Sequence, residues 1–357
     1  MRDYGYVPLV EVRRGDTVES VHHGAIVAAD PDGRVLAAAG DPETVTFLRS
    51  AAKPFQVMAL IASGAAERFG FTDRQIAVMA GSHGGEPDHV AVVRSILDRI
   101  DLDVPALQCG AHAPYHRPTA QDLRRRGEDP TPLHNNCSGK HAGMLAFARH
   151  LGASAADYLE PDHPVQRRIR EVIEAFARVP AGAARPAIDG CSAPTFALPL
   201  RLQARMFARL VNPESAPPGL HDAARRVVEA MRAHPVMVAG SDRLCTALMQ
   251  AGPGTFIAKI GAEGVYGLGW AAPAAGAERS PGSCGLAVKI ADGDGSRART
   301  LATLEALDQL EALPAGAIAL LRGRFVEDLR NHRGLRVGHV AAVFRLQSRG
   351  GAVRAVR

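Results

Sequence analysis

The chain of 357 residues has few of the features that mark secreted or membrane proteins. Its five cysteines are an odd number, so a framework of paired disulfides is not expected. No apolar run is long enough to span a bilayer, and the first residues, Met1–Tyr6, lack the apolar segment of a signal peptide. We therefore predict a cytoplasmic protein without membrane association.

An excess of one charge is also missing. The 42 basic residues nearly balance the 37 acidic ones, and arginine supplies most of the positive charge. The longest basic run, Arg124–Arg126, is short and contains no aromatic residue. We interpret this run as a solvated helix face and predict no nucleic-acid partner. The remaining composition, 46% hydrophobic and 22% charged, is typical of a globular protein with a sizeable core.

The hydrophobic pattern predicts strands near both ends of the chain and helices between them. The expected strands are 7–13, 25–29, 35–38, 255–260, 264–269, 284–291 and 335–346. The expected helices are 50–61, 74–80 with Asp73 as N-cap, 88–100, 163–178, 197–211, 219–233, 242–250 and 297–311. A further helix of small residues is expected after the polar turn that begins at His134, and it should end near Leu151. This order predicts an α/β (α+β) fold in a single domain over residues 1–357. One sheet would be built from residues 1–50 and 250–357, with an inserted helical region over 51–250.

A serine and a lysine stand three residues apart in the segment 49–54, which reads Arg-Ser-Ala-Ala-Lys-Pro. Residues at this spacing share a helix face, so a neutral Lys53 could take the proton of Ser50. Lysine ordinarily titrates near ~10.4, so a neutral Lys53 requires burial or a second cation nearby. The alternative interpretation is an N-cap serine followed by a solvated lysine.

Two further segments could supply partners for this pair. Three glycines surround Ser82 and His83 in 81–85, which allows unusual backbone angles and the close approach of a ligand. Lys259 ends an apolar strand, where it could lower the pKa of Lys53 or act on Ser82. The alternatives are a flexible loop with an incidental histidine and a lysine that faces water.

Cys137 and Cys191 each lie in a polar turn next to glycine, and neither is on an obvious apolar face. Thiolates are favoured zinc ligands, but two cysteines without a Cys-x-x-Cys or paired-histidine spacing could equally be buried free thiols. Asp189 and Arg49 could bind the ammonium and carboxylate groups of an amino acid, with Asn136 beside them. Their alternative roles are local caps and turns.

Taken together, the segments 49–56, 81–86, 135–143 and 189–195 resemble the Rhizobium etli-type L-asparaginases, class 3 of the asparaginase II family. The resemblance extends from about Val7 to Val343. It implies hydrolysis of L-asparagine to L-aspartate and ammonia by a homodimer. It also implies a fold similar to that of the serine β-lactamases and glutaminases.

The resemblance also implies roles for particular residues. It implies two serine–lysine pairs, Ser50 with Lys53 and Ser82 with Lys259. A zinc ion and a water would occupy a site formed by three side chains, Cys137, Lys140 and Cys191. The metal would affect substrate affinity rather than the chemistry, and the lysine must lose its proton to bind it. The residues expected to orient the substrate or the metal shell are Arg49, His83, Asn136, Asp189 and His141.

We therefore predict amide hydrolysis through an acyl-enzyme. Ser50 would attack the side-chain amide, and Ser82 with Lys259 would relay a proton to ammonia, with Ser82 as the alternative nucleophile. Two other functions are consistent with the sequence. One is a glutaminase or penicillin-recognising hydrolase with the same Ser-x-x-Lys pair. The other is a non-catalytic amino-acid-binding protein that zinc stabilises.

Overall fold

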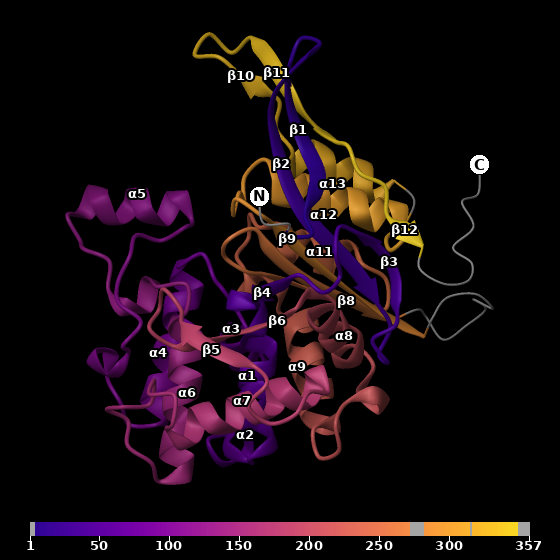
Figure 1. Ribbon diagram of the computed structural model, residues 1–357. Coiled ribbons are helices and arrows are strands. Elements are labelled where there is room, and N and C mark those ends of the chain that lie inside the picture. The colour runs from indigo at the N-terminus through magenta and orange to yellow at the C-terminus, as the bar shows by residue number, and fades with distance from the viewer. Residues whose placement is uncertain (1–3, 272–281, 315, 349–357) are drawn as a thin grey trace. The chain divides into compact units, whose positions relative to one another are not determined.

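The computed structural model describes residues 4–271, 282–314 and 316–348 (Figure 1). The chain forms two compact units. The sheet unit comprises Met1–Leu48, Leu198–Asn212 and Ala251–Arg357, and the helical unit comprises Arg49–Ala197 and Pro213–Gln250. The predicted single domain over 1–357 stays a prediction. The residues 198–212, which we expected in the helical region, belong to the sheet unit.

Strands from both ends of the chain form one antiparallel sheet in the sheet unit. The strands are β1 (Val7–Arg14), β2 (Thr17–Ala29), β3 (Val35–Ala39), β7 (Thr255–Ile260), β8 (Val265–Ala271), β9 (Ser283–Ile290), β10 (Leu329–Arg330), β11 (Arg336–Ala342) and β12 (Gln347–Ser348). The main path runs β10-β11-β1-β2-β9-β8-β7, and β3 pairs with both β2 and β12. N-terminal β2 lies beside C-terminal β9, with Ile26 opposite Val288. The predicted fold class, with a sheet built from both termini, is confirmed.

Helix α8 (Leu200–Leu210) packs on this sheet against β2, β8 and β9. The contact is close because the sheet presents glycine there. A Cβ atom on Gly267 would clash with the ring of Phe207, and one on Gly285 would clash with the carbonyl of Ala204. Glycine at these two positions therefore lets the helix backbone approach the strands. We expected the helix to begin at 197, but strand β6 (Pro194–Pro199) occupies the first of those residues.

Every residue of β9 is buried, so the sheet must be covered on both faces. Helix α12 (Ala298–Gln309) packs against β1, β8, β9 and β11, and Figure 1 shows it on the other side of the sheet from α8. The side chain of Asp294 accepts the backbone N–H groups of Arg297 and Ala298 at the start of this helix. Helix α13 (Ala317–Phe325), which packs on α12, was not predicted.

Helices dominate the helical unit. Its helices are α1 (Lys53–Ala62), α2 (Ala65–Arg68), α3 (Asp73–Met79), α4 (Pro87–Arg99), α5 (Arg117–Arg126), α6 (Ser138–Leu151), α7 (Pro164–Ala177), α9 (His221–Ala233), α10 (Pro235–Val238) and α11 (Leu244–Ala251). Helix α1 packs against α3, α6, α7 and α9, and residues 53–61 are all buried. The segment that begins at Ser50 therefore leads into the central helix of this unit.

One predicted helix cap was wrong. Asp73 is the first residue of α3 rather than its cap. The preceding Thr72 accepts the N–H of Gln75, whose side chain accepts the N–H of Thr72 in return. This reciprocal pair satisfies two N–H groups and therefore caps the helix better than an aspartate one residue later would. Among the described residues, no helix is long and apolar enough to cross a bilayer.

Candidate active site

Ser50 lies in a 3-10 turn, η1 (Arg49–Ala52), that runs directly into α1. Pro54 is near the start of this helix, where a missing N–H costs no hydrogen bond. Arg49 has a positive φ of 50°, which is unusual for a residue other than glycine. The side chain of Ser50 is partly exposed. Its hydroxyl has no hydrogen-bond partner in the part of the chain that the structure describes.

Lys53 is almost completely buried, with an exposed fraction of 1%, and its amino group touches three oxygen atoms. Nζ lies 2.7 Å from the carbonyl of Gly81, 3.2 Å from the carbonyl of Asn136 and 2.8 Å from Oγ of Ser82. The two carbonyls can only accept, so they use two of the amine protons. The third position of the amine therefore faces Ser82. It holds a proton when Lys53 is charged and a lone pair when it is neutral.

The environment of Lys53 favours the neutral amine. Burial lowers the pKa of Lys53, and the charge of Lys140 lowers it further, although the thiol of Cys137 acts in the opposite direction. We predicted a second cation with this effect and named Lys259. Lys140 supplies this effect within the helical unit. Lys259 belongs to the sheet unit, where its amino group donates to the carbonyl of Ile260 at 2.8 Å. Its pairing with Ser82 stays a prediction.

The loop that carries Ser82 is held by hydrogen bonds on both sides. The N–H of Ser82 donates to the carbonyl of Val238 at 2.7 Å. The ring of the next residue, His83, contacts Oγ of Ser138 at 3.0 Å and accepts the N–H of Gly85 at 3.2 Å. Both ring nitrogens of His83 are therefore occupied, and the side chain is fully buried. The predicted substrate contact of His83 stays a prediction.

Cys137, Lys140 and Cys191 come together, as the resemblance implied. Nζ of Lys140 lies 2.9 Å from Sγ of Cys191. A hydrogen bond between the thiols lowers the pKa of Cys137 well below its usual range and raises that of Cys191, so the pair shares one proton. Burial opposes the charge of Lys140, but the negative charge of the two sulfurs outweighs it and raises the pKa of Lys140. The three groups form a tightly coupled buried cluster.

The donor set of this cluster fits zinc chemically. Two thiolates and an amine nitrogen are ligands that zinc accepts, and a fourth tetrahedral position would remain open. The described residues include no group of three or more histidine, cysteine, aspartate or glutamate side chains that could hold a metal. The cluster of Cys137, Lys140 and Cys191 is not such a group, because one of its three donors is a lysine. Binding would require the loss of the Lys140 proton.

The residues predicted to bind an amino acid include one direct pair. Nε and Nη2 of Arg49 lie 3.0 Å and 2.8 Å from Oδ1 of Asp189. The side chain of Asn136 lies 3.1 Å from Nε2 of His112. Nδ1 of His141 lies 2.6 Å from the hydroxyl of Tyr158. These contacts place Arg49 and Asp189 together.

A model of the L-asparaginase II family matches residues 10–342. The chain belongs to the asparaginase II family. As a member of this family, it is an amidohydrolase of the asparaginase or glutaminase kind, and the predicted family is confirmed. The narrower Rhizobium etli-type assignment stays a prediction. None of the curated proteins compared with the chain matches it.

Among solved structures, this asparaginase II family member is similar to glutaminases, at low sequence identity. A probable glutaminase from Bacillus subtilis, complexed with 6-diazo-5-oxo-L-norleucine, has 13% identity and a TM-score of 0.39. That alignment covers 81% of this chain and 84% of the other. The native form of Mglu has 18% identity and a TM-score of 0.40, covering 84% of this chain and 63% of the other.

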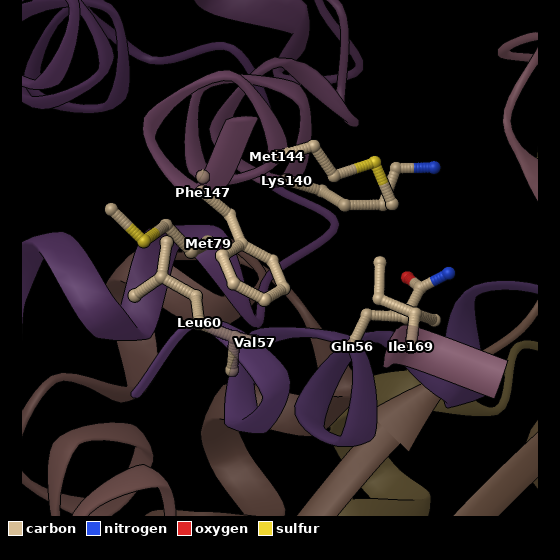
Figure 2. Close-up of a pocket in the computed structure, with 9 residues that line it drawn as sticks. Gln56, Val57, Leu60, Met79, Lys140, Met144, Phe147 and Ile169 are labelled. Atoms are coloured by element: carbon tan, nitrogen blue, oxygen red, sulfur yellow. The ribbon is translucent and has the colours of Figure 1, made fainter. Parts of the chain in front are cut away.

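One cavity of this asparaginase II family member lies beside the cysteine cluster. Figure 2 shows the side chains that line it, with Lys140 and Gln56 on one side and Met79, Leu60 and Phe147 on the other. Its volume is about 10 Å³, close to the minimum for a single water molecule. The cavity is thus too small for an amino acid. Its apolar wall instead surrounds the stem of Lys140 and adds to the burial of this amine.

Sequence reasoning missed three residues that hold the site of this family member together. They are His112, Ser138 and Tyr158, which contact Asn136, His83 and His141 respectively. Ser138 directly follows Cys137 in a segment that the sequence motifs marked, so its position beside Cys137 could have indicated its role. His112 and Tyr158 lie in stretches without a motif. Their roles depend on contacts between distant segments, which sequence spacing does not reveal.

Proposed function

We propose that this protein hydrolyses the side-chain amide of L-asparagine to L-aspartate and ammonia through an acyl-enzyme. The observation that carries the proposal is the buried contact of 2.8 Å between Nζ of Lys53 and Oγ of Ser82. Lys53 itself lies one helical turn after the partly exposed Ser50. A serine hydroxyl needs a nearby base. Burial and Lys140 lower the pKa of Lys53 toward that role.

Ser50 is the proposed nucleophile. Neutral Lys53 takes the hydroxyl proton as Oγ of Ser50 attacks the amide carbon, which gives a tetrahedral oxyanion and a charged Lys53. This step requires Nζ of Lys53 to turn from its contact with Ser82 toward Ser50. Backbone N–H groups at the start of α1 lack partners within the helix and would stabilise the oxyanion. Ser82 is less suited to attack because it is buried, whereas Ser50 is partly exposed and its hydroxyl has no partner among the described residues.

Ser82 is the proposed proton relay. It gives its hydroxyl proton to the departing nitrogen and regains one from the Lys53 ammonium, and the carbon–nitrogen bond breaks to leave ammonia and an ester on Ser50. In the second half, neutral Lys53 takes a proton from water as the water attacks the ester. The proton then returns to Ser50 as L-aspartate leaves. The predicted help of Lys259 at this step remains part of the proposal.

Arg49 and Asp189 are the proposed anchors of the α-carboxylate and α-ammonium groups. The contacts of Asp189 with Arg49 and with the N–H of Gly190 all use Oδ1. Oδ2 therefore remains available for an ammonium group in the described part of the chain. His141 offers a further donor. With the Tyr158 hydroxyl donating to Nδ1 of His141, the ring proton is on Nε2, and this buried atom has no partner among the described residues.

We further propose that Cys137, Lys140 and Cys191 hold zinc. When bound, the ion would supply positive charge that favours binding of the anionic groups of the substrate. The chain itself supplies the nucleophile, the base and the relay. The resemblance also supports a homodimer, which size-exclusion chromatography with light scattering would test.

The experiment that tests the function is ammonia release from L-asparagine and, in parallel, from L-glutamine, with and without added zinc. We expect release from asparagine, with loss of turnover in Ser50→Ala and in Lys53→Met. Ser63→Ala, at the other end of α1, is the matched control, because its hydroxyl bonds only local backbone groups. Ammonia release from L-glutamine alone would make L-glutamine the substrate in place of L-asparagine. Asparagine binding without release would favour the non-catalytic alternative.

Wild-type turnover in Ser50→Ala together with its loss in Ser82→Ala would make Ser82 the nucleophile. A mass shift on the serine that is trapped by an electrophilic substrate analogue would identify the acylated residue directly. The test thus separates the choice of substrate from the choice of serine.

A further inference from the structure

His83 follows Ser82 and is fully buried, yet each polar atom of its ring has a partner. Nε2 lies 3.0 Å from Oγ of Ser138, and Nδ1 lies 3.2 Å from the backbone nitrogen of Gly85. Oγ of Ser138 also lies 3.0 Å from the carbonyl of Leu133. The ring therefore connects the loop at 81–85 with the turn at 133–138.

These contacts fix the proton positions on the ring. A carbonyl can only accept, so the Ser138 hydroxyl donates to Leu133. The same hydroxyl oxygen must then accept from Nε2–H of His83. Nδ1 is left as the acceptor of the Gly85 N–H. His83 is consequently held as the neutral Nε2–H tautomer, with one donor and one acceptor and no alternative arrangement that satisfies all partners.

The loop and the turn also meet at the Lys53 amine. The carbonyl of Asn136 accepts the N–H of His83 at 3.3 Å and Nζ of Lys53 at 3.2 Å. Gly81, on the other side of Ser82, provides the second carbonyl for Lys53. The position of the Ser82 hydroxyl relative to Lys53 therefore depends on how the loop is held against the turn, and the His83 ring provides the side-chain link between them.

We propose that His83 is a positioning residue, and that its hydrogen bond to Ser138 holds the Ser82 hydroxyl against the Lys53 amine. The inference rests on the proposed function, in which this contact relays the proton to ammonia. It gives His83 a role other than substrate binding. It also adds Ser138, which directly follows the proposed zinc ligand Cys137, to the residues that the reaction requires.

The neighbouring His89 shows what a merely structural histidine looks like in this unit. Its ring stacks on that of His83 with centroids 4.9 Å apart. It accepts the N–H of Glu86 and donates to the carbonyl of Val236. Neither bond reaches Ser82, Asn136 or Lys53. The two histidines are thus alike in burial and bonding pattern, but only His83 links the loop to the turn that holds Lys53.

The first test compares two substitutions of His83. The amide of His83→Gln reaches the place of Nε2 and can still donate to Ser138, whereas His83→Asn can replace only Nδ1. We expect His83→Asn and Ser138→Ala each to lower kcat by about 10- to 100-fold with little change in KM, because positioning of a reacting group is lost. His83→Gln should keep most of the rate. The double variant should be no slower than the slower single variant.

Ser95→Ala is the matched control for Ser138→Ala. The Ser95 hydroxyl also donates to a backbone carbonyl, that of Val92, and accepts from a side-chain N–H, that of Gln75. The control should lose a similar amount of stability while kcat stays unchanged. Equal losses of kcat in His83→Gln and His83→Asn, or an unchanged kcat in Ser138→Ala, would overturn the inference.

A second measurement does not depend on the activity. In crystal structures, Nζ of Lys53 and Oγ of Ser82 should remain in contact in the wild type and in Ser95→Ala, and should separate beyond ~3.5 Å in Ser138→Ala. An unchanged contact in Ser138→Ala would overturn the positioning role. If the contact responds as expected but wild-type protein releases no ammonia from either amide, the proposed function fails while the positioning role stands.

Discussion

Arg49 and Asp189, two residues that sequence reasoning assigned to opposite ends of a bound amino acid, contact each other directly through Nε and Nη2 of the arginine and a single carboxylate oxygen. The pair is only slightly exposed. It joins the turn before α1 to the turn that carries Cys191. The ion pair therefore fixes two of the loops that surround the proposed substrate site. The second carboxylate oxygen of Asp189 remains for a ligand in the described part of the chain.

The first prediction concerns this pair. Asp189→Asn keeps the shape of the side chain but removes the charge that would bind the substrate ammonium group. We expect KM for L-asparagine to rise at least about 10-fold, corresponding to the loss of one charge-assisted hydrogen bond, with a smaller effect on kcat. Steady-state kinetics and a thermal melt of the variant check this. Glu43→Gln is the matched control, because Glu43 also binds an arginine, Arg201, in the sheet unit. A KM close to wild type in Asp189→Asn would remove Asp189 from the substrate site.

The second prediction concerns the cysteine cluster. Purified protein should contain about one zinc per chain, and Cys137→Ser or Cys191→Ser should remove it, since a serine hydroxyl is a poor replacement for a thiolate. Metal removal by a chelator should raise KM more than it lowers kcat, and added zinc should reverse the change. Elemental analysis and kinetics of the same samples provide the measurement.

Cys245→Ala is the control for these variants, because Cys245 is also a buried cysteine but lies in α11. It should keep its zinc. Two results would contradict the metal assignment. One is stoichiometric zinc in both the Cys137 and the Cys191 variants, and the other is metal-free wild-type protein with normal KM.

The third prediction concerns the stacked histidines. Burial lowers the pKa of His83 well below its usual value and lowers that of His89 as well, and His89 also disfavours charge on the stacked ring of His83. Other groups around them act too: Lys53, His112 and His134 oppose protonation of His83, and Glu86 and Asp88 favour protonation of His89. The folded protein therefore holds both rings neutral at a pH where the unfolded chain begins to bind protons, near ~6.5.

The sign of the pH effect follows from that difference. The stability that the neutral rings contribute is fully present above pH ~6.5 and decreases as the pH falls below this value, by up to about 1.4 kcal/mol per pH unit for each ring. Urea unfolding at pH 7.5 and 5.5 should show the loss. His89→Phe, which keeps the stacked ring but cannot titrate, should reduce the pH dependence by the share of one ring, up to about 1.4 kcal/mol per pH unit. An identical dependence in that variant would assign the effect to other groups.

Sequence reasoning succeeded where the determining contacts are local. The helix that follows Ser50, the strands at both ends and the convergence of Cys137 with Lys140 depend on spacing within a few residues or on family motifs. Even a local prediction can be wrong by one residue, as at Thr72 and Asp73. The capping box begins at Thr72, and the acidic residue that we took for the cap is the first residue of the helix. Helix α13 is amphipathic only weakly and contains Gly323, which weakened the pattern.

The contacts that define the candidate site are not local. Lys53 and Ser82 are separated by 29 positions, and His83 and Ser138 by 55. No spacing rule connects such residues, so the pairing of Lys53 with Ser82 and the tautomer of His83 emerge only from the fold. The same holds for Lys140, whose effect on the pKa of Lys53 depends on the packing of α1 against α6.

The last prediction concerns the close packing of α8 on the sheet. In Gly285→Ala the new methyl group would meet the backbone carbonyl of Ala204, which cannot move aside without shifting the helix. We expect a loss of stability of about 1–3 kcal/mol, the usual cost of overpacking a core. The matched control is Gly323→Ala in α13, where a Cβ atom meets nothing within 4 Å. Alanine is the better helix former, so this control should gain about 0.5–1 kcal/mol. Urea unfolding of the two variants should therefore give changes of opposite sign, and equal changes would mean that backbone propensity, rather than contact with α8, decides the residue at 285.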